Sequence, residues 1–286
     1  MAVIDTLPPE YYEQGHIPGA LNACVYEMVF TDRMKELIAN RAARVVVYGT
    51  SDRSRGAAVA IEKLSRAGYS DVRELAGGME AWQAAGFPLE LSGMPKPEIS
   101  PTMADGRYVI DTLASRLEWT GRNINKRHHG TIAVAMGEVS FKGGLPLAGE
   151  IVLDMNTIVN LDLDDETYNR MLIRHLKSDD FFDVEHYPAA TYSINAAEAL
   201  LDAAPGSPNY RLKGALELKG KRRELDLATE IALQESGVLK AWAACDLDRT
   251  LWGAIYGSGR YFEKLGMHLV SDLVSVEIFL TASRRN

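Results

Sequence analysis

Alternating apolar and polar residues recur through the second half of the chain and constrain its fold more than any other feature. One face of three such stretches carries Ile132, Val134 and Met136, then Leu212, Gly214, Leu216 and Leu218, and then Val274, Val276, Ile278 and Leu280. A period of two is typical of a half-buried strand. Glycine-containing connections such as Gly143-Gly144 separate these stretches, as in an antiparallel meander. We therefore predict about eight strands that close into a barrel, whose interior is either filled by side chains or holds one apolar ligand.

One helix interrupts this strand pattern. Residues 164–166 are acidic, as is common at a helix N-terminus, and the apolar face that follows is Tyr168, Met171, Leu172 and His175. The run 175–188 then ends the helix, and Tyr192 and Ile194 alternate with polar neighbours as the next strand begins. We expect Phe181 and Phe182 to lie where this helix is attached to the sheet.

Several separated motifs in the second half occur in the order of a known family. The run 175–188 reads HLKSDDFFDVEHYP. The others are Tyr108 to Asp111 with Ser115, Trp119-Thr120-Gly121, Gly149-Glu150, Asp154-Met155-Asn156, Gly214, Gly220, Asp248 to Gly253, and Tyr256-Gly257-Ser258. Together they resemble the YceI-like family, a lipocalin-like barrel group that binds polyisoprenoid and other long-chain lipids. The resemblance covers residues 107 to about 283 and implies a barrel that holds an isoprenoid, quinone or fatty-acyl ligand, a choice that periodicity alone does not make.

The resemblance implies a ligand wall of large apolar and aromatic side chains on the strands and on the helix. The candidates are Trp119, Val134, Met136, Leu153, Met155, Met171, Phe181, Phe182, Tyr192, Leu216, Trp242 and Trp252. Each of them taken singly is also a typical core residue, because any barrel needs such side chains to fill it. Only their joint assignment predicts a tunnel for lipid.

Residues 123–129 form a polar cluster with three interpretations. It is a mouth loop that meets a polar head group, a solvated hairpin turn, or a metal pair at His128 and His129. Adjacent side chains on a strand point to opposite faces, so we expect no metal there. The stretch from Asp248 to Thr250 is expected to supply an internal ion pair. We find no nucleophile-base constellation and no glycine-rich phosphate loop in this half, so we predict no catalytic residues.

Residues 1–98 show strands alternating with helices instead. Val45 to Tyr48 is a continuous apolar run, which suits a parallel strand covered on both faces. A tight loop follows, and then a helix carries Ala57, Ala58, Ile61 and Leu64 before it ends at Gly68. Strand, tight loop and helix form an anion cradle, because backbone N–H groups at the helix start point into the loop.

This first segment resembles the rhodanese family. The matching residues are Asp5, the run Gly15-His16-Ile17-Pro18-Gly19-Ala20, the run 45–58, Gly77-Gly78 and Trp82. The resemblance implies an α/β fold with a parallel sheet flanked by helices. Family members usually have a strand and a helix before the first aspartate, so the segment is either a shortened variant or part of a chain that starts upstream.

The resemblance also predicts that this rhodanese-like segment is inactive. Active members carry a cysteine that becomes a persulfide at the position where this chain has Gly49, and without a thiolate there is no sulfur acceptor. The degenerate loop is Gly49, Thr50, Ser51, Asp52, Arg53 and Ser54. We expect the segment to be a folding partner or a docking surface for a protein. The alternatives are residual anion binding by the loop and a sulfurtransferase that uses Cys24.

Prolines mark the boundary between the two resemblances. Pro88, Pro95, Pro97 and Pro101 are four of the 11 prolines in the chain, and such a stretch is typical of a semi-rigid spacer. We therefore predict a rhodanese-like domain at 1–98, a linker at 99–106 and a YceI-like β-barrel domain at 107–286.

Composition excludes several classes of partner. The net charge is −8 and neither half has a basic excess, so we expect no nucleic acid partner. No segment approaches the roughly 20 consecutive apolar residues of a membrane helix, and the first residues lack the pattern of a signal peptide. We expect a cytoplasmic protein that does not span a membrane and has two unpaired cysteines, no metal, and no cofactor besides a bound lipid.

The sequence thus favours a binding protein over an enzyme. Its expected partners are an apolar small molecule in the barrel, a protein at the rhodanese-like domain and a second copy of the chain through the barrel. Two alternatives stay open: a sulfurtransferase-related enzyme that uses the anion-cradle loop, and a docking module whose barrel is filled by its own side chains.

Overall fold

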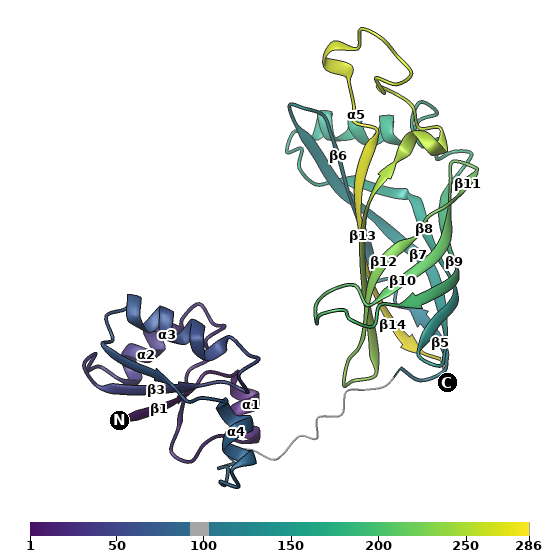
Figure 1. Ribbon diagram of the computed structural model, residues 1–286. Helices are drawn as coiled ribbons and strands as arrows, with labels where there is room; N and C mark the ends of the chain where they lie inside the picture. Colours follow the sequence, from purple (N-terminus) through teal and green to yellow (C-terminus); the bar gives the residue numbers. More distant parts are fainter. Residues whose placement is uncertain (92–102, 286) are drawn as a thin grey trace. The chain divides into compact units, whose positions relative to one another are not determined.

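The computed structural model describes residues 1–91 and 103–285, and the chain divides into two compact units, residues 1–98 (unit 1) and 99–286 (unit 2). Figure 1 shows both units. The predicted linker at 99–106 lies partly outside the described residues, and Pro95, Pro97 and Pro101 lie outside them entirely.

Unit 1 is a four-stranded parallel sheet flanked by helices, which confirms the predicted α/β class. The strand order is β2-β1-β3-β4, so the apolar run of β3 lies inside the sheet. The strands are β1 (Ala2–Asp5), β2 (Leu21–Asn22), β3 (Arg44–Tyr48) and β4 (Asp71–Glu74), and the helices are α1 (Pro9–Gln14), α2 (Phe30–Leu37), α3 (Gly56–Arg66) and α4 (Gly78–Ala84).

Unit 2 is a closed antiparallel barrel with eight strand positions, which confirms the predicted barrel. The barrel closes where β9 pairs with β10. Two short strands, β5 and β6, share the position between β14 and β7. The strands are β5 (Gly106–Ile110), β6 (Arg116–Arg122), β7 (Arg127–Lys142), β8 (Leu145–Asn160), β9 (Ala189–Ala199), β10 (Tyr210–Leu218), β11 (Lys221–Glu224), β12 (Leu227–Leu233), β13 (Val238–Asp248) and β14 (Leu273–Arg284).

The alternation along β7 changes face partway, which corrects one expectation. Ile132 and Val134 are buried as predicted, whereas the Met136 side chain is 59% exposed. The pairing of β7 with β8 shifts register between Val134 and Met136. A register shift of this kind adds a residue to one strand and turns the following side chains to the other face. Beyond the shift, the buried positions of β7 are Val139 and Phe141.

Helix α5 (Glu166–Lys177) lies across one end of the barrel (Figure 1), and its inward face matches the predicted one at Leu172 and His175 but not at Tyr168 and Met171. Its buried residue is Leu176, with Leu172 packed on the core, while Tyr168 and Met171 are 64% and 49% exposed. The side-chain amide of Asn169 donates to two backbone carbonyls in the segment before the helix. These bonds turn Asn169 inward and leave Tyr168 and Met171 in solvent.

The turn after α5 fixes Phe181 and Phe182 beside the barrel, as predicted. The Phe181 N–H donates to the Ser178 carbonyl at 3.0 Å. The Lys219 ammonium group, at the end of β10, donates to the carbonyls of Asp179 at 2.7 Å and Phe181 at 2.8 Å. The two phenylalanine rings pack edge to face with centroids 4.9 Å apart. Hydrogen bonds to its main-chain carbonyls therefore hold the turn, and its aromatic side chains point to the barrel core.

Two short 3-10 helices, η1 (Arg249–Trp252) and η2 (Gly266–His268), lie between β13 and β14. Asp248 caps η1 by accepting the Thr250 N–H at 3.0 Å. The segment from Gly253 to Asp272 forms a long arm at the same end of the barrel as α5 (Figure 1).

Candidate functional site

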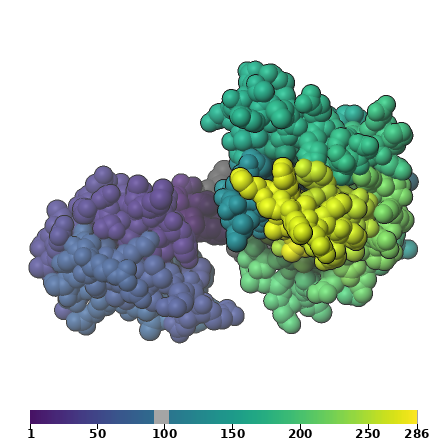
Figure 2. Space-filling model, turned by 90° about the horizontal axis from the view of Figure 1, so that it is seen from above, coloured from purple at the N-terminus to yellow at the C-terminus, as the bar shows by residue number. Residues whose placement is uncertain are grey.

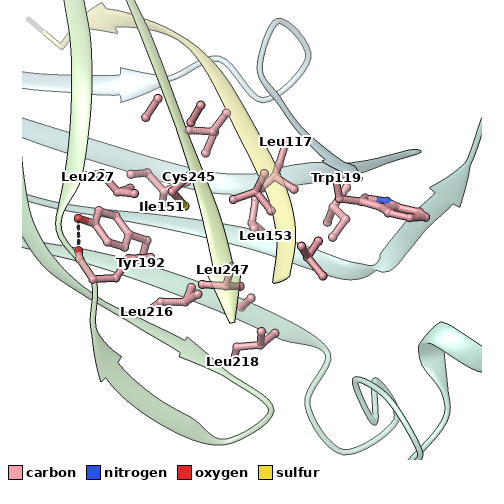
Figure 3. Close-up of a pocket in the computed structure, with 18 of the residues that line it drawn as sticks. Leu117, Trp119, Ile151, Leu153, Tyr192, Leu216, Leu218, Leu227, Cys245 and Leu247 are labelled. Atoms are coloured by element: carbon pink, nitrogen blue, oxygen red, sulfur yellow. Dashed lines mark hydrogen bonds between the residues drawn. The ribbon is translucent and has the colours of Figure 1, made fainter. Parts of the chain in front are cut away.

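The barrel of unit 2 encloses an apolar cavity of about 170 Å³ (Figure 3). Its wall includes inward residues of β13 and β14 that alternate with outward ones along each strand. These inward residues are Ala241, Ala243, Cys245 and Leu247 on β13, and Val274, Val276, Ile278 and Leu280 on β14. The other strands contribute further aliphatic side chains, so the cavity offers hydrocarbon contacts along its whole length.

The cavity is long and narrow. Its wall on β13 runs from Ala241 to Leu247, which spans about 20 Å along the strand at about 3.3 Å per residue. A volume of about 170 Å³ spread over this length is a tunnel rather than a rounded chamber. Such a shape suits one extended chain better than a fused ring system.

The two ends of the tunnel differ in the side chains around them. At the α5 end its wall includes Trp119, Leu176 and Phe181. At the opposite end, Tyr108 and Phe141 are buried and pack edge to face with ring centroids 5.1 Å apart. Both belong to the barrel core, but neither lines the cavity. Figure 2 looks down from above, and the yellow C-terminal part of the chain covers the middle of the α5 end.

Seven of the predicted wall residues surround the cavity: Trp119, Leu153, Met155, Phe181, Phe182, Tyr192 and Leu216. Trp242 borders it, but its indole N–H donates to the exposed Glu277 carboxylate at 3.4 Å on the outer face. Val134 and Trp252 are buried in the core away from the cavity, and Met136 and Met171 are exposed. A ligand role for any of these residues remains a prediction.

Sequence reasoning missed the small residues that create the space. Ala190, Ala241, Ala243 and Cys245 line the cavity and leave room between strands where larger side chains would fill it. The signal was present in the alternation of β13 and β14, whose inward positions could have been assigned to the wall together. The candidates were chosen for their large side chains, which fill a barrel. The small side chains, which leave space inside it, were therefore missed.

The polar groups at the wall of this apolar tunnel include those of Tyr192, Cys245 and Trp119. The Tyr192 hydroxyl donates to the Leu225 carbonyl at 2.9 Å, and burial raises the pKa of Tyr192. Burial also raises the pKa of the Cys245 thiol, which is therefore neutral at pH 7. The indole N–H of Trp119 has no acceptor within the described residues, although the side chain is 7% exposed.

Arg249 connects the arm to the cavity wall. Its fully buried guanidinium donates to the carbonyls of Ser271 at 3.1 Å and Val270 at 3.3 Å, and also to that of Ala254. It lies over the Phe181 ring at 5.0 Å. Burial lowers the pKa of Arg249, and the carboxylate of Asp272 at 3.9 Å opposes this effect. The ion pair expected near Asp248 is made instead by Arg260, at 3.3 Å from Asp248.

The polar cluster 123–129 brings two histidines to one carboxylate. His128 Nδ1 lies 2.8 Å from Asp162 Oδ2, and the His129 N–H donates to Asp162 Oδ1 at 2.7 Å. Burial tends to raise the pKa of Asp162, but these bonds and one from Asn160 outweigh it and lower that pKa. In the part of the chain that the structure describes, no three His, Cys, Asp or Glu side chains are grouped as metal ligands.

In unit 1 the loop after β3 is tied to α4 by its own polar groups. The Met79 N–H donates to the Gly49 carbonyl at 3.0 Å, and the Glu80 N–H donates to the Thr50 carbonyl at 2.9 Å. The Asp52 carboxylate accepts the Gly77 N–H at 2.6 Å. The loop is therefore tied to the start of α4, and its Asp52 carboxylate adds a negative charge beside the loop that disfavours an external anion.

A buried polar cluster lies beneath this loop at the end of β1. The Asp5 carboxyl is fully buried and accepts the Leu7 N–H at 2.8 Å. The His16 ring stacks on Tyr12 at 3.7 Å, and its Nδ1 lies 2.8 Å from the Tyr12 carbonyl. The Tyr48 hydroxyl accepts the Ile17 N–H at 3.0 Å. Burial raises the pKa of Asp5, and hydrogen bonds from Leu7 and Tyr48 only partly offset it.

Family models match both units. The YceI-like domain matches residues 108–282, and the Rhodanese-like domain matches residues 1–85. Among the helices of residues 1–91 and 103–285, none has the length and apolar character needed to cross a membrane.

Individual proteins resemble one unit or the other. The HTH-type transcriptional regulator Rv0324 of Mycobacterium tuberculosis is 33% identical over 94 residues, which are 32% of this chain and 38% of its own length. The chain thus spans well under half of that curated relative. The crystal structure of Burkholderia cenocepacia BcnA is 21% identical, with a TM-score of 0.46, and covers 61% of this chain and 99% of its own.

Two further solved structures are similar. A polyisoprenoid binding domain from Saccharophagus degradans is 18% identical with a TM-score of 0.45, and covers 62% of this chain and 98% of its own. The Rhodanese_3-like domain of the Anabaena Alr3790 protein is 32% identical with a TM-score of 0.29, and covers 32% of this chain and 99% of its own.

Proposed function

Because the chain belongs to the YceI-like family, we propose that its barrel binds one long-chain apolar molecule, an isoprenoid, quinone or fatty-acyl compound, and sequesters or carries it. The observation that supports this most directly is the narrow, apolar tunnel inside unit 2. A barrel filled by its own side chains, the docking-module alternative, would have no such tunnel.

The energetics favour a chain of moderate length. Burial of a methylene contributes about 0.8 kcal/mol, so ten methylenes contribute roughly 8 kcal/mol before ordering costs are subtracted. The tunnel wall offers no ionised group that a hydrocarbon would have to leave unsolvated, since the Arg249 guanidinium is bonded to three carbonyls. A bound chain therefore loses little to polar desolvation.

The α5 end is the proposed opening. The tunnel wall there includes Phe181 and the partly exposed Phe182, whereas the opposite end is packed by Tyr108 and Phe141. A chain that enters at α5 places its apolar tip toward the closed end.

The rhodanese-like unit is proposed to be a docking partner without sulfur-transfer chemistry. We propose domain boundaries that place the rhodanese-like domain at residues 1–98, the linker at 99–106 and the barrel domain at 107–286. Gly49 supplies no thiolate, and the Asp52 carboxylate places a negative charge in the loop that an anion would have to approach. A protein partner of this unit and self-association of the barrel remain proposals, as does a cytoplasmic location.

Native mass spectrometry of the freshly purified full-length protein tests the barrel function. We expect a stoichiometric mass increase that solvent extraction releases as a long-chain lipid. An unmodified mass, together with no uptake from a panel of quinones and fatty acids, would overturn the proposal in favour of the docking module.

A matched pair of substitutions tests the tunnel itself. Cys245→Phe places a ring in the tunnel, where the Cys245 sulfur lies among the wall residues (Figure 3), and should reduce lipid uptake at least tenfold. Met136→Phe places the same ring on the outer surface and should leave uptake unchanged. Circular dichroism checks that both variants are folded. Equal uptake by both variants would show that the ligand does not occupy this tunnel.

The inactive-loop proposal has its own test. We expect no persulfide after incubation with thiosulfate and no thiocyanate on addition of cyanide. Turnover that disappears in Cys24→Ser would show that this thiol is the sulfur acceptor and would overturn the proposal.

A further inference from the structure

We infer that unit 2 docks on the surface of a lipid bilayer that contains anionic lipids. It does so through the tip of the arm and the adjacent turn between β6 and β7. This inference rests on the proposed function and extends it, because it names the surface with which the barrel exchanges its apolar ligand. The tip surface consists of Ile124, Lys126, Arg127, Tyr261, Phe262, Lys264, Met267 and Leu269.

Large apolar side chains are exposed together at this surface. Ile124 and Met267 are 94% and 87% exposed. Tyr261, Phe262 and Leu269 are between 42% and 52% exposed. Single exposed apolar residues are common on proteins, but a group of them within one short segment marks an interaction site.

The arm and the β6–β7 turn are joined, so their exposed side chains form one surface. The Ser271 N–H of the arm donates to the Arg122 carbonyl at the end of β6 at 2.9 Å. A shallow hollow of about 520 Å³ lies between the two segments and is lined by Ile124 from the turn and Leu269 from the arm. Figure 1 shows that the arm extends beyond α5, away from the barrel.

Main-chain hydrogen bonds fix the shape of the tip. The Ser258 carbonyl accepts the N–H groups of Tyr261 at 3.2 Å and Phe262 at 3.0 Å. At the base of the tip, the Val270 N–H donates to the Gly257 carbonyl at 2.8 Å. The exposure of these aromatic side chains is therefore a property of a folded loop. Tyrosine suits the head-group level of a bilayer, and apolar side chains such as Phe262 suit the acyl boundary below it.

The charge of the tip surface matches an anionic bilayer. Segments 122–127 and 259–269 contain five basic residues and one acidic residue, Glu263, although the whole chain has a net charge of −8. Lys126, Arg127 and Lys264 are exposed and have no ion-pair partner among the residues that the structure describes. Each such cation strengthens binding to a surface that carries anionic lipids.

The acidic residues near this end are largely engaged within the chain. Arg260 pairs with the carboxylates of Asp248 at 3.3 Å and Asp272 at 3.7 Å. At the start of α5, Asp165 caps the helix and Glu166 pairs with Arg170 at 2.9 Å. They therefore oppose the free cations of the tip surface only weakly.

The arm also connects the tip surface to the tunnel. Arg249 donates to the Ser271 carbonyl at 3.1 Å, and its guanidinium lies over the Phe181 ring of the tunnel wall at 5.0 Å. Contact of the arm with a bilayer places the proposed opening against lipid, so that a chain passes into the barrel without crossing water. An acidic protein would match the cations but would leave Ile124 and Met267 without a role.

Flotation of the full-length protein with vesicles tests the tip surface. One set of vesicles is phosphatidylcholine alone, and in the other set phosphatidylglycerol replaces a third of the lipid. We expect the protein to float with the second set, to bind the first set roughly tenfold more weakly, and to be released from the second set as the salt concentration rises. Absence of flotation with both sets would overturn the inference.

A pair of double variants tests the apolar contacts. Phe262→Ser with Met267→Ser should weaken binding to the anionic vesicles by roughly tenfold or more, because less apolar area enters the bilayer. The matched control is Leu113→Ser with Leu201→Ser, in the β5–β6 and β9–β10 connections, where both side chains are as exposed as Met267. The control should bind like the wild type. Equal binding by the two double variants would overturn the inference.

A second pair of double variants tests the charge. Lys126→Gln with Lys264→Gln should weaken binding to the anionic vesicles by roughly tenfold and leave binding to phosphatidylcholine unchanged. The control, Lys142→Gln with Arg211→Gln, removes two exposed cations at the closed end of the barrel. Equal effects of both pairs would overturn the assignment to an anionic bilayer.

Hydrogen exchange of the wild type decides the question if a serine variant does not fold. With the anionic vesicles present, we expect slower exchange of the amides of residues 260–268 and unchanged exchange of those of residues 200–207. Protection that spares the arm would overturn the inference.

The outcomes separate this inference from the function on which it rests. A protein that contains a lipid by native mass spectrometry but binds no vesicles would overturn the docking and leave the carrier intact. A protein that binds vesicles through the arm but contains and takes up no lipid would support the docking and overturn the carrier. A dimer that dissociates in Phe262→Ser with Met267→Ser, without vesicle binding, would assign the tip surface to a second copy of the chain and overturn the inference.

Discussion

At the scale of single residues, Gly130 is the position where two strands and an indole approach most closely. A Cβ atom there would lie 1.7 Å from the Val159 carbonyl oxygen and 2.8 Å from Trp119 Cζ2. Gly130→Ala should therefore destabilise unit 2 by about 3 kcal/mol or more, at the upper end of single-substitution effects. Guanidinium unfolding followed by circular dichroism measures the loss.

Gly121 provides the matched control on the paired strand. It lies on β6 opposite His128, and a Cβ atom there meets nothing within 4 Å. Gly121→Ala should change the free energy of unfolding by no more than about 0.5 kcal/mol. A similar loss in both variants would mean that the close approach at Gly130 is not the cause.

Asp5 should make the stability of unit 1 depend on pH. Burial raises its pKa above the ordinary value of 3.8, so the folded state holds a proton that the unfolded state releases earlier. The stabilisation is complete below pH 3.8 and is lost as the pH rises through the raised pKa. Asp5→Asn cannot ionise and should gain stability relative to the wild type between pH 4 and 7. Parallel urea-unfolding midpoints of the two proteins over that range would contradict this.

Residue identity predicted much of the site but not its hydrogen bonding. Trp119 and Tyr192 were recognisable as wall candidates because large aromatic residues on a strand face lie in a core. The Tyr192 hydroxyl donates to the carbonyl of Leu225, which is more than 30 residues distant along the chain, whereas the Trp119 N–H has no acceptor within the described residues. Such a partner is set by the closed barrel and not by local sequence.

At the scale of elements, the N-terminus of α5 depends on one carboxylate. Asp165 accepts the N–H groups of Thr167 at 2.8 Å and Tyr168 at 3.1 Å. Asp165→Ala should cost about 1 kcal/mol, which is typical for loss of an N-cap. Hydrogen exchange of the α5 amides should accelerate accordingly. Asp164→Ala, at the exposed neighbouring position, is the control, and equal acceleration in both variants would argue against the cap.

The strands were predictable from alternation, but the places where alternation changes face were not. Residues 131–136 read as an uninterrupted alternating stretch, yet β7 shifts register against β8 within it. There the Ala133 N–H donates to the Thr157 side-chain oxygen at 2.8 Å in place of a ladder carbonyl. The partner strand thus determines the bulge, and a single strand read alone places Met136 on the wrong face.

At the scale of the whole molecule, a ligand of the barrel should stabilise unit 2 and leave unit 1 unaffected. A chain at 100 times its Kd contributes about 2.7 kcal/mol, which for a domain of this size raises the midpoint by roughly 5–10 °C. Scanning calorimetry of the full chain should show one transition that moves and one that does not. Two transitions that shift together would show that the units are coupled.

The two folds followed from motifs spread along the chain, whereas the hollow in the barrel did not. The motifs around Gly15 and Phe181 mark main-chain geometry that each fold requires, so they identify the architecture directly. Whether a barrel is filled depends on the summed volume of its inward-facing side chains. Exchanging Ala243 for a larger residue would close the tunnel without changing any motif.

Tyr108 and Phe141 close one end of the tunnel, and this closed end limits the length of chain that the barrel can hold. Each methylene added to a ligand should strengthen binding until the tip of the chain meets these rings. Further carbons would then remain outside at the α5 end and contribute almost nothing. Affinity plotted against chain length should rise and then level off, and the carbon number at which it levels off would measure the depth of the tunnel.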